Sequence, residues 1–184
     1  GRKLLQHVED LLCGARQRYT GGHFPQSFEF STVGGWIAAL GSGQQSSYYG
    51  DACDLVVSQE YVTPVGTFTT ADFAATATGP KVNDIMKGSE GAFGVLTAVT
   101  LKIFRADLGR PQCFAYMLPG WDQAVAAARR ISQGEFGMPS MLRISDPEET
   151  DAAVQAYGLD HPLAQRFLRW RGLHPGRRCL LIAQ

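Results

Sequence analysis

Residues 25–50 carry the side chains and backbone features that best fit a polar, planar ligand. This stretch contains hydroxyl groups at Ser27, Ser31, Thr32 and Ser42 and the indole of Trp36. Backbone N–H groups freed by glycine could wrap such a ligand together with these side chains. A surface loop without a ligand fits the same composition equally well. The glycines that let the backbone approach a ligand closely are Gly34, Gly35, Gly41, Gly43 and Gly50.

A second glycine-rich segment lies further along the chain. Gly88, Ser89, Glu90 and Gly91 lead into residues 94–104, where apolar and polar side chains alternate as in a strand. Taken alone, these residues indicate a tight turn at the start of a strand, with Glu90 in solvent. Paired with the first stretch, they favour a ligand site.

The bulk composition argues against several classes of protein. Of the 184 residues, 45% are hydrophobic and 18% are charged, which suffices for a buried core. Because 17 basic side chains balance 17 acidic ones, we expect no nucleic-acid partner. No apolar run approaches the roughly 20 residues of a membrane-spanning helix, so we expect a cytoplasmic protein. Wide spacing predicts reduced thiols and no metal site for Cys13, Cys53, Cys113 and Cys179.

Hydrophobic periodicity predicts the elements that would position these segments. In the first half we expect a helix over residues 3–19, a hairpin of strands 54–63 and 66–70, a short helix over 82–87 and a strand over 94–104. In the second half we expect strands over 113–118 and 141–145 and helices over 121–133 and 148–157. Asp146 followed by Pro147 marks the start of the last helix.

The residues between the halves, 105–111, contain Gly and Pro and predict a domain boundary. We therefore divide the chain into domains 1–106 and 107–184 of the α+β class. The chain begins without Met, and its last residues, Leu180–Gln184, resemble a strand cut off midway. We expect an internal fragment with two incomplete domains.

Motifs in the first half resemble a known family. PQSFEFSTVGGW at residues 25–36 is followed by SGQQSSYYG at 42–50, a TPVG turn at 63–66 and GSEGAFGVLTAVTLKI at 88–103. In this order they resemble the FAD-binding domain of PCMH type in the vanillyl-alcohol oxidase superfamily. D-lactate dehydrogenases and alkyl-dihydroxyacetonephosphate synthases share that domain. The resemblance implies the C-terminal part of the FAD-binding domain, without its N-terminal pyrophosphate-loop subdomain, followed by the start of an antiparallel α/β cap domain.

The resemblance also implies FAD as cofactor. Ala92 and Phe93 stand where the family commonly has Thr and Leu, so a hydroxyl contact would be missing. His23 could act as a base or a flavin attachment point, but it has no evident partner, and we interpret it as a turn histidine without chemistry. The expected flavin contacts are Pro25, Gln26, Ser27, Phe28, Glu29, Phe30, Ser31, Ala38, Ala39, Leu40, Gly41, Ser42, Glu90, Gly91, Ala92, Phe93, Gly94, Val95 and Leu96.

In the second half, PSMLRISDPEET at residues 139–150 resembles a cap-domain strand that carries an arginine facing the substrate. Arg143 is the matching position. On a strand its side chain points away from the face of Leu142 and Ile144, and a guanidinium can hold a carboxylate or phosphate bidentately. A surface ion pair explains Arg143 equally well.

Two chemistries are compatible with the resemblance. The sequence of residues 25–36, together with LRISD at residues 142–146, favours an alkyl-dihydroxyacetonephosphate synthase. Such an enzyme exchanges an acyl for an alkyl group through a flavin adduct in ether-lipid synthesis. The alternative is an FAD-linked oxidoreductase that oxidises a D-2-hydroxy acid such as lactate or glycolate. A third hypothesis is a non-catalytic binding module that has lost the flavin.

The substrate would be a small molecule with a carboxylate or a phosphate ester. We expect a peripheral membrane contact if that substrate is a lipid, and we consider a homodimer. We do not expect the fragment alone to turn over substrate.

Overall fold

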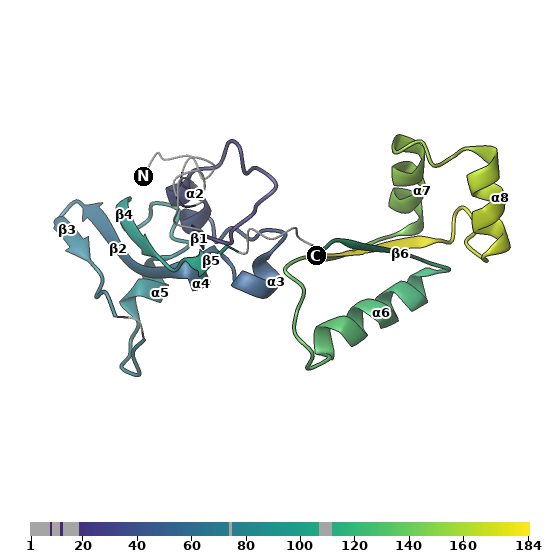
Figure 1. The fold of residues 1–184 in the computed structure, drawn as a ribbon. Helices are drawn as coiled ribbons and strands as arrows, with labels where there is room; N and C mark the ends of the chain where they lie inside the picture. Colours follow the sequence, from purple (N-terminus) through teal and green to yellow (C-terminus); the bar gives the residue numbers. More distant parts are fainter. Residues whose placement is uncertain (1–7, 9–11, 13–18, 74, 107–111) are drawn as a thin grey trace. The chain divides into compact units, whose positions relative to one another are not determined.

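The computed structural model describes residues 8, 12, 19–73, 75–106 and 112–184, and it has the α+β class expected from the sequence. Its contacts divide the chain into two units, Gly1–Arg110 and Pro111–Gln184. Each unit contains a three-stranded antiparallel sheet (Figure 1). The helix expected over residues 3–19 lies outside the described residues apart from Val8 and Leu12, which are helical, and Tyr19.

The sheet of the first unit has β2 (Val56–Thr63) at its centre, in the order β3-β2-β4. A tight turn connects β2 to β3 (Gly66–Thr69), and Thr63 Oγ1 donates a hydrogen bond to Gly66 O at 2.7 Å. The expected hairpin is therefore confirmed. On its other edge β2 pairs with β4 (Val95–Leu101).

One strand was expected over residues 94–104, but the structure has two. After β4, the N–H of Lys102 donates to Leu55 O at 2.8 Å, beyond the start of β2. The chain then pairs β5 (Phe104–Arg105) with β1 (Tyr19–Thr20) in a separate ladder.

Short helices connect these strands. They are α2 (Val33–Ala38), α3 (Ser46–Tyr49), α4 (Ala52–Leu55) and α5 (Val82–Met86), the last of which confirms the helix expected over 82–87. The strand expected from residue 54 begins only at Val56, because Asp51 and Asp54 form a capping box that starts α4. Asp54 Oδ2 accepts a hydrogen bond from Asp51 N at 2.9 Å.

The core of the first unit lies between α2 and the sheet. Ile37 is fully buried, and full burial of such a side chain contributes about 1.5–3 kcal/mol. Thr32 caps the helix by accepting a hydrogen bond from Gly35 N at 3.1 Å. Packing and cap together hold α2 against the sheet. The buried cluster consists of Val33, Trp36, Ile37, Ala52 and Val56.

The second unit places its last strand in the middle of its sheet. β8 (Cys179–Ala183) lies between β6 (Phe114–Leu118) and β7 (Leu142–Ser145). α6 (Trp121–Gln133) runs along one side of this sheet and α7 (Pro147–Ala156) rises from the other (Figure 1). β6, α6, β7 and α7 confirm the two strands and two helices expected in this half. α8 (Pro162–Trp170) was not predicted.

Thr150 and Asp151 tie α7 to β8 and to the residues before β8. Thr150 Oγ1 donates to Ser145 O at 3.3 Å and accepts from Leu180 N at 3.0 Å. The carboxylate of Asp151 accepts hydrogen bonds from Arg178 Nε and Gly176 N, both at 2.6 Å.

No helix in the described part of the chain is long and apolar enough to cross a membrane. Cys53, Cys113 and Cys179 are free thiols, as expected, and Cys13 lies outside the described residues.

Candidate functional site

The first two segments expected to contact the flavin meet at one cavity of about 740 Å³. α2 forms a wall of this cavity, and the chain before and after α2 closes around it. The two loops are joined where Gln44 N donates to Phe24 O at 2.9 Å. The lining residues include Pro25, Gln26, Ser27, Ser31, Trp36 and Ser42.

Turns within the first segment decide which of its residues reach the cavity. Hydrogen bonds from Phe30 N and Ser31 N to Ser27 O, at 2.9 and 2.8 Å, fold the backbone back on itself. The ring of Phe28 stacks on Phe24 at 4.8 Å, and Phe30 lies in solvent. Phe28, Glu29 and Phe30 therefore do not line the cavity, whereas Pro25, Gln26, Ser27 and Ser31 do.

A second cavity, of about 500 Å³, contains most of the third expected segment. Gly35 lines both cavities, so they adjoin at α2. The turn after α5 is fixed to the end of α2, because Gly88 N donates to Ile37 O at 3.1 Å and Glu90 N to Ala38 O at 3.3 Å. The residues that line the second cavity include Ala38, Ser89, Gly91, Gly94, Val95 and Leu96.

Besides Phe28, Glu29 and Phe30, four further expected contacts line neither of these two cavities: Leu40, Glu90, Ala92 and Phe93. Leu40 and Glu90 have left-handed backbones, with φ of 51° and 47°. This conformation costs a non-glycine residue roughly 1–2 kcal/mol, and such strain occurs at functional sites. A Cβ atom on Gly88 would lie 2.6 Å from Leu40 Cγ, so the loop after α2 and the turn after α5 pack directly together.

Two buried polar atoms at the first cavity have no hydrogen-bond partner among the described residues. They are Ser31 Oγ and Trp36 Nε1. A buried polar atom without a partner costs about 1–3 kcal/mol. A ligand with acceptor and donor groups along a planar edge would satisfy both atoms, so these residues fit a flavin. Ser31 was expected as a contact, and Trp36 was noted in the stretch but not assigned.

His23 lies deeper than a turn residue. It is 2% exposed, and its ring centroid lies 4.5 Å from that of Trp36. Neither ring nitrogen has a hydrogen-bond partner among the described residues. Burial lowers the pKa of His23, and the Asp51 carboxylate offsets part of this effect. We infer from this geometry that the His23 ring is neutral and supports the indole of Trp36.

A third cavity, of about 630 Å³, lies beside α5. Lys81, Lys87 and Lys102 line it, together with Thr69 and Thr70. No residue expected to contact the flavin lines this cavity, so we do not place the flavin there.

In the second unit, Arg143 lies on β7 opposite Ile182 of β8. It is more exposed than its neighbours Leu142 and Ile144, in agreement with strand alternation. Its guanidinium pairs with Glu149 in the first turn of α7. The side chain remains 52% exposed, so an anion could still reach it.

Tyr61, Ser89 and Thr97 line the second cavity but were not expected at the site. Strand alternation alone would have turned Tyr61 and Gln59 to the same face of β2. Sequence alone does not show that this face borders a cavity, because the other side of the cavity is formed by the turn after α5, whose position is known only from the structure.

Comparisons with known proteins identify the family of this chain. A sequence profile of the FAD binding domain matches residues 7–72. The chain is 41% identical, over 132 residues, to an alkyldihydroxyacetonephosphate synthase of Dictyostelium discoideum, which covers 70% of this chain and 21% of that protein. It is 35% identical, over 132 residues, to YgcU of Escherichia coli K12, an uncharacterized FAD-linked oxidoreductase, which covers 71% of this chain and 27% of that protein.

A solved structure of an alkyldihydroxyacetonephosphate synthase superposes with a TM-score of 0.82 at 33% identity, covering 98% of this chain and 32% of that one. The chain thus spans 21% to 32% of the length of these proteins. It belongs to the FAD-binding flavoprotein family that includes alkyldihydroxyacetonephosphate synthases and FAD-linked oxidoreductases, and its cofactor is FAD.

Proposed function

We propose that the protein containing this chain is an FAD-dependent alkyldihydroxyacetonephosphate synthase that forms the ether bond of a lipid precursor. The observation that carries the proposal is the cavity at α2, where Ser31 Oγ and Trp36 Nε1 are buried without partners in the segments that resemble the family. Relatives that match most of this chain bear the name of that synthase.

Bound FAD supplies the reaction chemistry, and this chain supplies binding and orientation. Ser31 Oγ and Trp36 Nε1 would hydrogen-bond to polar atoms of the flavin. The residues of the second cavity from Gly91 to Leu96 would border the ring, where Gly91 has no heavy atom within 4 Å of its missing Cβ. That open space suits the close approach of a flat ligand.

Arg143 is the residue of the second unit that we propose for the substrate. Its exposed guanidinium could exchange Glu149 for the phosphate of a dihydroxyacetone phosphate ester. The exchange is inexpensive, because an exposed ion pair contributes only about 0–1 kcal/mol. A phosphate offers the same bidentate geometry with more negative charge.

The test uses the full-length protein encoded by the gene. Its absorbance spectrum should contain the bands of oxidised flavin. Incubation with an acyl-dihydroxyacetone phosphate and a long-chain alcohol should release the fatty acid and yield the alkyl ether, measured by mass spectrometry. Bleaching of the flavin by a D-2-hydroxy acid, without ether formation, would instead establish an oxidase.

Oxidation of a D-2-hydroxy acid and a binding module without flavin are not favoured by the relatives that match this chain. The spectroscopic and product assay described above distinguishes both alternatives from the synthase. A protein that takes up no flavin after reconstitution would refute both enzymes.

For the partners, we propose that α8 contacts an anionic membrane surface from which the lipid substrate is drawn. Leu163, Phe167 and Trp170 share one face of this helix and are all exposed. Arginines accompany this face at 166, 169 and 171, and the sequence has no acidic residue after Asp160. An apolar face flanked by arginine is typical of helices that lie in a membrane interface.

Liposome flotation tests this contact. The protein should float with vesicles that contain phosphatidylglycerol, less with pure phosphatidylcholine, and Trp170→Ser should weaken flotation without changing FAD content. Equal flotation of both proteins would refute a role for α8. A cytoplasmic location and a homodimer stay predictions.

A further inference from the structure

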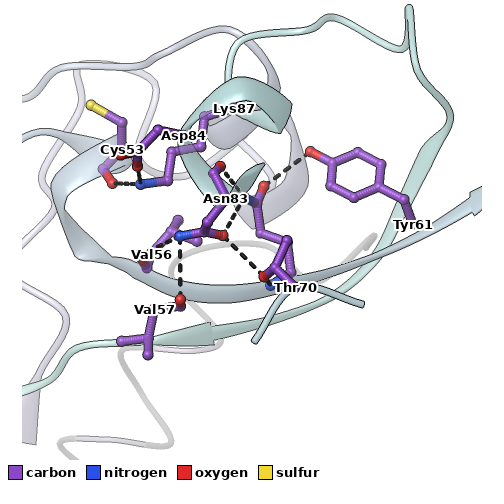
Figure 2. A network of polar contacts seen from close by, with 9 residues as sticks. Cys53, Val56, Val57, Tyr61, Thr70, Asn83, Asp84 and Lys87 are labelled. Atoms are coloured by element: carbon purple, nitrogen blue, oxygen red, sulfur yellow. Dashed lines mark hydrogen bonds and ion pairs between the residues drawn. The ribbon is translucent and has the colours of Figure 1, made fainter. Parts of the chain in front are cut away.

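A cluster of polar side chains joins β2 to α5 (Figure 2), and one of its members, Tyr61, lines the second cavity. Gln59 is 1% exposed and Tyr61 2% exposed. Gln59 Nε2 donates to Asn83 O at 2.8 Å and to Asn83 Oδ1 at 2.7 Å. The Tyr61 hydroxyl lies 3.0 Å from Gln59 Oε1 and 3.1 Å from Met86 O, and these two acceptors share its single proton.

Asn83 connects this cluster to the strand. Its Nδ2 donates to Val56 O at 3.3 Å and Val57 O at 3.2 Å. Its Oδ1 also accepts from Thr70 Oγ1 at 3.2 Å, and Thr70 Oγ1 accepts from Gln59 N at 2.8 Å. The start of α5 is thus bound to β2 through side chains whose polar groups are all used.

The other end of α5 is held as well. Tyr61 binds the carbonyl of Met86, the last residue of the helix. Lys87 Nζ donates to Cys53 O at 2.6 Å and forms an ion pair with Asp84 at 2.8 Å (Figure 2). Burial raises the pKa of Tyr61, and a hydrogen bond with the Ser89 side chain partly opposes this rise.

The turn directly after α5 depends on these contacts. A helix of five residues does not fix its own position in water, since isolated helices below about 12 residues are marginal. Gly88, Ser89, Glu90 and Gly91 come just after its end, and this turn borders the second cavity together with Tyr61. The place of the turn is therefore set from two sides, by its backbone hydrogen bonds to α2 and by where α5 is held.

We propose that Tyr61 and Gln59, acting through α5, are positioning residues for the turn Gly88–Gly91 that borders the flavin. The inference rests on the proposed flavin site at α2. Besides its contacts with Met86 O and Gln59, the Tyr61 hydroxyl has a hydrogen bond with the side chain of Ser89, in the turn itself. Its removal should leave the fold intact and displace or loosen the turn.

The test compares Tyr61→Phe with Thr150→Val in the full-length protein. Thr150→Val also removes a buried hydroxyl with two hydrogen bonds, but in the unit that does not contain the turn. Apoprotein is titrated with FAD while flavin fluorescence is followed. Loss of the Tyr61 hydrogen bonds should raise the FAD Kd on the order of tenfold, and Thr150→Val should leave it unchanged.

Amide hydrogen exchange in the apoprotein gives a second readout that does not need bound FAD. The N–H groups of Gly88 and Glu90 donate to α2, so they report where the turn sits. Their exchange should accelerate about tenfold in Tyr61→Phe and not in Thr150→Val. Unchanged exchange and unchanged FAD affinity in Tyr61→Phe would overturn the inference.

The two proposals fail in different ways. Wild-type protein that binds no FAD refutes the flavin site, whereas the exchange rates still decide whether Tyr61 positions the turn. Gln59→Met, which removes both donor bonds to Asn83, should repeat the effect on Gly88 and Glu90. A variant with normal exchange at both amides would count against the role of Gln59.

Discussion

Gly43 is the position where one added methyl group should disturb the flavin cavity most directly. A Cβ atom there would lie 2.6 Å from both the carbonyl carbon and the carbonyl oxygen of Phe24. These are backbone atoms, so they cannot turn aside as a side chain could. Gly43→Ala must therefore push apart the two loops that the bond from Gln44 N to Phe24 O, 2.9 Å long, joins at the cavity.

Two contributions set the size of the effect. Inserting a methyl group into a packed contact costs about 1–3 kcal/mol. Loss of the Gln44 to Phe24 hydrogen bond adds about 0.5–1.5 kcal/mol. The left-handed backbone penalty does not apply, because Gly43 is absent from the residues with positive φ. We expect a loss of about 2–4 kcal/mol in the free energy of unfolding, together with weaker FAD binding.

The assay is urea denaturation of the apoprotein, followed by Trp fluorescence, and FAD titration of each variant. Gly79→Ala is the matched control in the same unit, because a Cβ atom on Gly79 would meet no heavy atom within 4 Å. We expect that control to stay within about 0.5 kcal/mol of the wild type. The reasoning is refuted if Gly43→Ala matches Gly79→Ala in both stability and FAD affinity.

Three further predictions concern His23, Thr150 and Arg143. Burial holds the pKa of His23 below the usual 6.5, so the unfolded chain binds this proton at a higher pH than the folded chain does. The free energy of unfolding should therefore fall as the pH drops below about 6.5. His23→Phe should flatten this slope in thermal melts from pH 8 to pH 5. Thr150→Val should cost about 1–3 kcal/mol in urea unfolding, because Leu180 N loses its acceptor, and Thr150→Ser should cost less. Arg143→Lys should lower kcat/KM for the phosphate ester about 10- to 100-fold, with under about 1 kcal/mol change in stability, because its pair with Glu149 is exposed. Unchanged kcat/KM would remove Arg143 from the substrate site.

The segments that line the two cavities were named from the resemblance of residues 25–50 and 88–103 to the FAD-binding family. Composition alone did not decide between a ligand site and a loop without a ligand. Local sequence could not tell which residues of each segment face inward. The turn that places Phe30 in solvent depends on backbone hydrogen bonds to Ser27 O. The pattern of apolar and polar residues does not predict these bonds.

The elements of regular periodicity were also predictable, and the exceptions have physical causes. α7 was found from Asp146 and Pro147, because a cap and a first-turn proline are local signals. α8 was not predicted, although Leu163, Phe167 and Trp170 have helical spacing, and in the structure these residues form an exposed face and not part of the core. The helical start at Ala52 was missed because β-prone residues from Leu55 onwards hid the capping box.

The strand order of the second unit sets a limit on how that unit can form during synthesis. β8 is made after both β6 and β7, yet both of these strands pair with it. Until Cys179–Ala183 leaves the ribosome, the ladder edges of β6 and β7 have no partner in this sheet. Such unpaired edges are where nascent chains associate wrongly, so pairing in this sheet must wait for β8. Protection of this unit by a chaperone would matter most in the interval between synthesis of α7 and synthesis of β8.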